Sequence, residues 1–76
     1  MSKHPDKWIW RCMATIARRG KATDFRKGQA VGPRPAQRGI DQGWLLGTIA
    51  SATLSPKAKK YMAEVEEARR QLLEAQ

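Results

Sequence analysis

Cationic side chains crowd the middle of the chain and are its clearest chemical signal. Seven of them fall within residues 18–38, where Asp24 is the one acidic residue: Arg18, Arg19, Lys21, Arg26, Lys27, Arg34 and Arg38. Guanidinium and ammonium groups at this density attract phosphates, and interspersed glycines let the backbone approach closely. Gln37 adds an amide that can bind the edge of a base. We expect these cations and Gln37 to form a nucleic-acid-binding site, with Arg38 and Gln37 as the base contacts.

The net charge is divided unevenly along the 76 residues. Residues 1–60 carry 13 basic and 3 acidic side chains, a net charge of +10, whereas residues 61–76 carry 2 and 4, a net charge of −2. The two parts sum to the formal charge of +8. Such a division suggests two surfaces with separate roles, a basic one for a polyanion and a mildly acidic one for pairing with another chain.

Catalytic and metal-binding chemistry has little support in the residue types present. Cys12 lies inside an apolar helical stripe without a base nearby, so we expect a buried structural thiol, and we expect His4 to be exposed. One cysteine and one histidine cannot build the usual zinc cluster of four ligands. The aspartates lie near expected helix ends and the glutamates on an expected solvated helix face, so neither set requires a catalytic role. The sequence contains no catalytic or phosphate-loop motif. We therefore expect no enzyme activity, no metal, no cofactor and no small-molecule substrate.

Length and hydropathy restrict the class of protein further. A chain of 76 residues has room for one small domain, residues 1–76, with a single thin core. The apolar centre of the longest uncharged run, residues 44–54, is much shorter than the roughly 20 residues of a membrane-spanning helix. The N-terminus lacks the apolar stretch of a secretory signal. We expect a cytoplasmic protein that does not bind membranes.

Residues 7–19 must form the first element that positions these side chains. Ile9, Cys12, Met13 and Ile16 recur at the spacing of one helix face. Asp6 is suited to cap the start of the helix, and Gly20 to follow its end.

Residues 20–43 contain five glycines and two prolines, which exclude one long helix. Two short helices, Asp24–Val31 and Pro35–Gln42, are one interpretation, with Pro35 in the first turn and Gly43 past the end. An extended basic loop is the other, because short helices are marginal in isolation.

Residues 44–54 favour a β-hairpin over a helix because β-branched and aromatic residues are frequent there. We expect a turn near Ala50–Ser51 that pairs Trp44–Ile49 with Ala52–Leu54. We expect the three tryptophans to serve the core rather than to stack on bases, which leaves Phe25 as the aromatic residue among the cations.

Residues 56–75 have the strongest helical pattern, with Ser55 as the N-cap and Pro56 in the first turn. Apolar residues recur at three- and four-residue steps along residues 58–75. We expect this stripe to pack on the chain's own core. The alternative is that residues 58–75 pair with a protein partner or with a second copy in a homodimer.

The C-terminal half resembles the end of a winged-helix domain. Gly43-Trp44-Leu45 is similar to the end of that family's recognition helix, and Leu54-Ser55-Pro56-Lys57 through Tyr61-Met62 is similar to the start of the helix after its wing. The match covers residues 43–62. The resemblance implies a DNA-binding domain that places Pro35–Gln42 in the major groove and the turn within residues 48–53 beside it.

The predicted fold class is therefore a small α+β domain, mostly helical with a short hairpin, resembling a winged helix and ending in a long C-terminal helix. The predicted function is nucleic-acid binding, with DNA favoured over RNA, dominated by phosphate contacts. The alternative is a small inhibitor or adaptor of phage type, similar to an anti-CRISPR, that docks on a protein or nucleoprotein machine. A small subunit of a ribonucleoprotein is a third interpretation.

Overall fold

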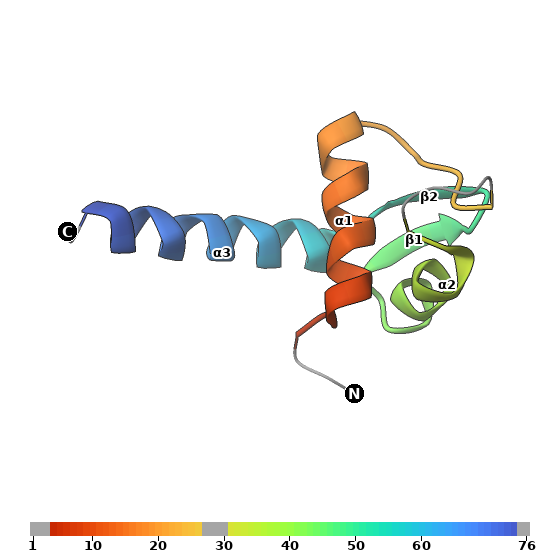
Figure 1. Ribbon diagram of the computed structural model, residues 1–76, viewed down its shortest axis with the longest axis horizontal. Coiled ribbons are helices and arrows are strands. Elements are labelled where there is room, and N and C mark those ends of the chain that lie inside the picture. Colours follow the sequence, from red (N-terminus) through yellow and green to blue (C-terminus); the bar gives the residue numbers. More distant parts are fainter. Residues whose placement is uncertain (1–3, 27–30, 75–76) are drawn as a thin grey trace.

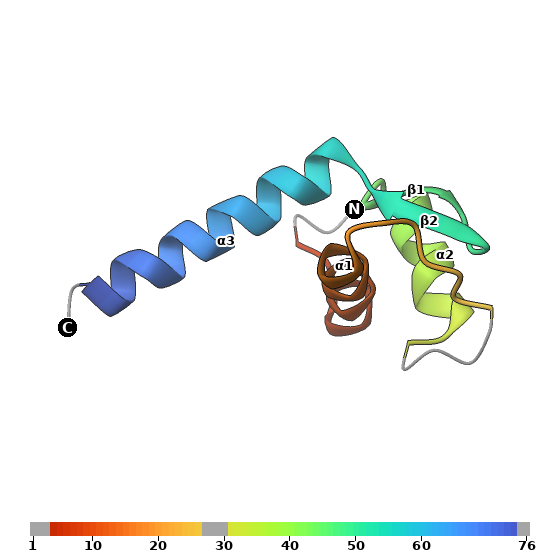
Figure 2. The ribbon, with the colours of Figure 1, turned by 90° about the horizontal axis from the view of Figure 1, so that it is seen from above.

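A computed structural model describes residues 4–26 and 31–74. Its elements are, in chain order, α1 (Lys7–Arg19), α2 (Pro33–Asp41), β1 (Leu45–Thr48), β2 (Ser51–Leu54) and α3 (Pro56–Glu74). The hairpin and α2 pack to one side of α1, and α3 projects from the other side (Figures 1 and 2). The chain is thus a small α+β domain, mostly helical with one antiparallel hairpin and a long C-terminal helix, as the sequence predicts.

Helix α1 has the predicted bounds because both of its ends are fixed by local contacts. The Asp6 carboxylate accepts a hydrogen bond from the Ile9 amide at 2.8 Å. Gly20 adopts a left-handed conformation with φ of 70°, and its amide donates to the Ile16 carbonyl. A side-chain cap at the start and a left-handed glycine at the end satisfy backbone groups that an open helix leaves unpaired.

Helix α2 begins two residues earlier than predicted, at Pro33 rather than Pro35, and ends at Asp41 with Gln42 as its C-cap. The first turn of a helix needs no amide hydrogen, so it accommodates both prolines. The helix predicted for Asp24–Val31 is wrong for the described residues 24–26 and 31, while residues 27–30 lie outside the described residues. The backbone at Thr23 instead pairs with Ala52 of β2 in an antiparallel bridge.

The hairpin is present, but its turn lies one residue earlier than predicted. Thr48 pairs with Ser51, so the turn consists of Ile49 and Ala50. Neither residue has the positive φ that the common tight hairpin turns require. Gly47 supplies the left-handed backbone instead, with φ of 93°, and a Cβ there would collide with the carbonyl oxygen of Ser51.

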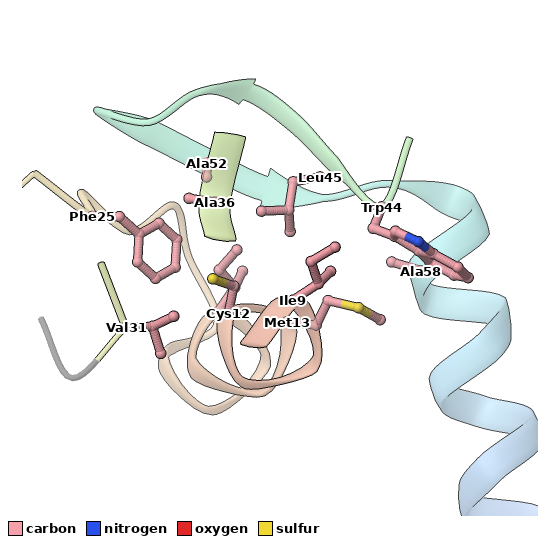
Figure 3. Close-up of a cluster of buried hydrophobic side chains, with 11 residues drawn as sticks. Ile9, Cys12, Met13, Phe25, Val31, Ala36, Trp44, Leu45, Ala52 and Ala58 are labelled. Atoms are coloured by element: carbon pink, nitrogen blue, oxygen red, sulfur yellow. The ribbon is translucent and has the colours of Figure 1, made fainter. Parts of the chain in front are cut away.

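The core lies between α1, α2 and the hairpin (Figure 3). The four residues of the predicted α1 stripe are all buried, and Cys12 is a buried free thiol whose pKa burial raises to about 11. Trp44 is also buried and lies against Ala58 at the start of α3 (Figure 3). The expectation that every tryptophan serves the core is wrong for Trp8, which is 46% exposed.

Helix α3 belongs to the core only at its start. The Ser55 hydroxyl accepts a hydrogen bond from the Ala58 amide at 3.1 Å, which confirms the predicted N-cap. Ala58 is the buried residue of this helix, Tyr61, Met62 and Val65 are half-buried, and residues 66–74 are exposed. The stripe therefore packs on the chain's own core along its first half only. No described helix is long and apolar enough to cross a membrane.

Candidate nucleic-acid interface

A shallow hollow between α2 and the turn of the hairpin brings together two of the predicted site residues. Arg26 and Gln37 both line it, together with Ile40 of α2 and residues 47–50 of the hairpin. Arg26 comes from the loop after α1 and Gln37 from the middle of α2. The hollow therefore juxtaposes a cation, an amide and the exposed Thr48 hydroxyl on one surface.

Backbone contacts hold Arg26 at this position. Its neighbour Phe25 is fully buried, and the Phe25 amide donates a hydrogen bond to the Ile49 carbonyl at 2.9 Å. The Asp24 carboxylate accepts from the Arg26 amide at 2.9 Å and pairs with the exposed guanidinium at 3.2 Å. The side-chain hydrogen bond and the negative charge of Asp24 raise the pKa of Arg26, so its side chain stays charged. Because Phe25 is in the core, it offers no stacking surface among the cations.

Gln37 lies on the exposed side of α2. Its side-chain amide donates to the Asp41 carboxylate, one turn further along the helix, at 3.0 Å. A primary amide has two donor hydrogens and one acceptor oxygen, so this bond leaves Gln37 further capacity to bind a base edge. The carboxylate of Asp41 would repel a nearby phosphate, which restricts phosphate contacts to the start of α2.

Arg38 lies away from this hollow and joins α2 to the start of α1. Its guanidinium binds the Asp6 carboxylate at 2.9 Å, and both side chains are about half exposed. The Ile9 amide and the Arg38 guanidinium together hold the pKa of Asp6 below its usual value of 3.8, against a smaller opposing effect of desolvation. The structure therefore assigns Arg38 a contact between helices, which competes with its predicted role in base contact.

The remaining predicted cations are distributed around the body. Arg18 lines a hollow beside Val31 and Arg11, whereas Lys21 lines another with Lys59. Arg34 is exposed near the start of α2, Arg19 is exposed in the last turn of α1, and Lys27 lies outside the described residues. Arg18, Lys21 and Arg34 form no ion pair with another residue of the described chain. Cations in the last turn of a helix also complement its dipole, so Arg18 and Arg19 have a local structural role as well.

Two cations outside the predicted set, Arg11 and Lys59, each adjoin a predicted one in a separate hollow. Arg11 lines the hollow with Arg18 and lies over the exposed Trp8 ring, with 5.0 Å between the guanidinium carbon and the ring centroid. The seven-residue interval between Arg11 and Arg18 places both on one helix face, and this spacing was the available signal. Lys59 adjoins Lys21 only through tertiary packing, which no local pattern could reveal.

The two ends of the molecule differ in charge. Figures 1 and 2 place α2, the hairpin turn and residues 20–26 at the end of the body opposite to the direction in which α3 extends. The basic residues 1–60, with a net charge of +10, and the acidic residues 61–76, with a net charge of −2, are therefore also separated in space.

Comparison of the chain with protein-family models, curated proteins and solved structures finds no match.

Proposed function

We propose that the chain binds duplex nucleic acid through the end of the body formed by α2, the hairpin turn and residues 20–26. The observation that carries the proposal is the hollow where Arg26 and Gln37 meet the hairpin turn, at the end of the body remote from the acidic half of α3. Arg18, Arg19, Lys21 and Arg34 supply further exposed cations. Such a surface favours binding dominated by phosphate contacts, which need no base sequence.

The dimensions of α2 support DNA rather than RNA as the duplex. An α-helix with its side chains is about 10–12 Å across, and the major groove of B-DNA is about 12 Å wide, so it admits a helix such as α2. The major groove of duplex RNA is deep and narrow, which excludes a helix. The hairpin turn beside α2 would then contact the adjacent backbone. This placement is the one that the resemblance to a winged helix implies.

Salt dependence provides the first test. If the five described cations Arg18, Arg19, Lys21, Arg26 and Arg34 each neutralise one phosphate, log K should fall with log salt at a slope of about −4.5. Affinity should then drop about 500-fold between 50 and 200 mM salt. Fluorescence anisotropy with a labelled DNA duplex measures this, and duplex RNA and single-stranded DNA serve as competitors. A flat salt response, or absence of binding at 50 mM salt, contradicts the proposal, and tighter binding of duplex RNA contradicts the assignment to DNA.

Charge-removing variants locate the surface. Arg26→Gln and Arg34→Gln should each make the slope of log K against log salt shallower by about 0.9. Neither change should shift the Tm of the protein. Arg70→Gln is the matched control, because Arg70 is an exposed cation on the distal half of α3. Equal losses for Arg70→Gln and Arg26→Gln would mean that binding follows net charge rather than this surface.

A capture experiment separates nucleic acid from a protein partner. The tagged chain captures its partners from a cell lysate, and the captured material is compared before and after nuclease digestion. Loss of the captured species on digestion supports the proposal, whereas a partner that remains bound afterwards supports docking on a protein.

A further inference from the structure

The distal half of α3 ends in two leucines that the chain itself leaves uncovered. Leu72 and Leu73 are each 68% exposed, and residues 66–74 have no buried member. The helix extends from the body as an arm (Figures 1 and 2), which makes the molecule 42 Å long but only 26 by 19 Å in its other two dimensions. Exposed leucines at the end of such an arm are a feature of surfaces that bind another chain.

The uncovered face continues the face that packs on the body. Ala58, Met62, Val65, Arg69 and Leu72 follow alternating steps of four and three residues, which keep them on one side of a helix. Ala58 is buried in the core and Met62 is half-buried, whereas Leu72 is exposed. One helix face is therefore covered at its start and open at its end.

An open apolar groove lies where α3 leaves the body. Trp10 and Ala17 of α1 and Leu54 of β2 form one wall, and Met62, Val65 and Arg69 of α3 form the other, around a volume of about 430 Å³. Glu66 also lines this groove. Because Leu72 and Leu73 follow Arg69 by three and four residues, they lie on the same side of α3 as the groove.

We propose that this groove receives the distal α3 of a second copy of the chain, so that two α3 helices pair antiparallel in a homodimer. A twofold axis between residues 67 and 68 places Leu73 of the second copy opposite Met62, inside the groove. The same axis places Arg69 of the second copy opposite Glu66. Both contacts occur twice, so each copy fills the other's groove and the assembly closes without a free end.

Charge favours this orientation and this partner. Parallel pairing would bring two bodies with +10 in residues 1–60 side by side, whereas antiparallel pairing places them at opposite ends. The acidic end of each α3, with Glu74 and the negative end of the helix dipole, then approaches Lys59, which lines the groove of the other copy. The chain is thus complementary to itself in charge along α3.

The test measures the mass of nuclease-treated protein by sedimentation equilibrium at low salt. We expect a dimer with twice the 8.6 kDa mass of the chain. Glu66→Arg and Arg69→Glu should each raise the dimer dissociation constant about tenfold or more, because each replaces two attractive pairs with two repulsive ones. Far-UV circular dichroism checks that each variant keeps its helices.

Mixing the two variants distinguishes a contact between copies from one within a helix. Glu66→Arg and Arg69→Glu are complementary to each other only across the interface, so their mixture should regain the wild-type association. Glu67→Arg is the matched control, because it makes the same change one residue away, on the side of α3 that does not line the groove. It should associate as the wild type does.

The combined Leu72→Gln and Leu73→Gln variant tests the apolar contact separately. Both side chains are exposed in the single chain, so the fold should persist while the dissociation constant rises about a hundredfold. A monomeric wild type at millimolar concentration overturns the proposal. So does a failure of the mixture to associate, an unchanged dimer in the leucine variant, or an equal effect of Glu67→Arg.

Discussion

Replacing Ser55 by alanine should destabilise the domain by about 2 kcal/mol. Ser55 is 3% exposed, and its side chain connects three parts of the fold. Its oxygen accepts the Ala58 amide at the start of α3, and loss of such a cap costs about 1 kcal/mol. The hydroxyl donates its one proton toward the Gly43 carbonyl, with 2.6 Å between the oxygens, and the Trp44 carbonyl oxygen lies 3.1 Å away. A donated bond of this kind contributes about 1 kcal/mol.

The loss should not greatly exceed this sum, because neither carbonyl becomes isolated. The Trp44 carbonyl also accepts the Ser55 amide at 3.2 Å, and Gly43 is exposed, so water can replace the hydroxyl there. For a domain of this size, about 2 kcal/mol corresponds to a decrease in Tm of about 8–16 °C. Thermal and urea unfolding followed by circular dichroism at 222 nm measure both quantities.

Ser51→Ala is the control for Ser55→Ala. Ser51 is an exposed residue of β2, so this change should alter the free energy of unfolding by no more than about 0.5 kcal/mol. If Ser55→Ala falls within the same range, Ser55 does not connect the hairpin, the end of α2 and α3 in the manner described. A much larger loss would mean that the start of α3 unfolds with the cap and that the carbonyls are not rehydrated.

Three further predictions concern the core and the start of α1. Gly39→Ala should lower the free energy of unfolding, measured in urea titrations, by about 1 kcal/mol. A Cβ at Gly39 would lie 2.9 Å from a Leu45 methyl, and this overpacking outweighs the helix preference of alanine. A stabilised variant would contradict this reasoning. The pKa of Asp6 is lower in the folded than in the unfolded chain, so its contribution to stability is complete above about pH 4 and is lost as pH falls through the folded-state pKa. Asp6→Asn should therefore show a flatter decline in urea midpoint below pH 4, and parallel curves for the two proteins would refute the assignment. Cys12 is fully buried and its pKa is raised to about 11, so a thiol reagent at pH 8 should modify it quickly only after unfolding in urea; rapid labelling of the native chain would show that the thiol is accessible.

The elements of this fold follow largely from local sequence signals. Asp6 and Gly20 set the two ends of α1 through contacts within one turn, and Ser55 sets the start of α3 in the same way. The predicted hairpin turn is wrong by one residue because the decisive feature is Gly47, which lies inside a strand rather than in the turn. The predicted Asp24–Val31 helix is wrong for the described residues 24–26 and 31, where the Phe25 amide instead binds the Ile49 carbonyl of the hairpin turn, far along the chain.

The composition of the candidate interface could be predicted, but its geometry could not. The cations of residues 18–38 identify a basic surface, and their number sets the expected salt dependence. Which of them meet depends on packing between segments. Arg26 and Gln37 share one hollow, whereas Arg38 binds Asp6 on another side of α2. Nothing in the chain near Arg38 indicates that contact, because its partner is 32 residues away.

The sequence alone determined the charge separation, both ends of α1, the start of α3 and the apolar stripes, since these depend on residue type and on spacing within a few turns. Tertiary structure alone decided how far each stripe is covered. The core of a 76-residue chain is small, and α1, α2 and the hairpin leave room for only the first turns of α3. Its remaining turns therefore extend into solvent with Leu72 and Leu73 exposed, because no apolar surface of the same chain lies within their reach.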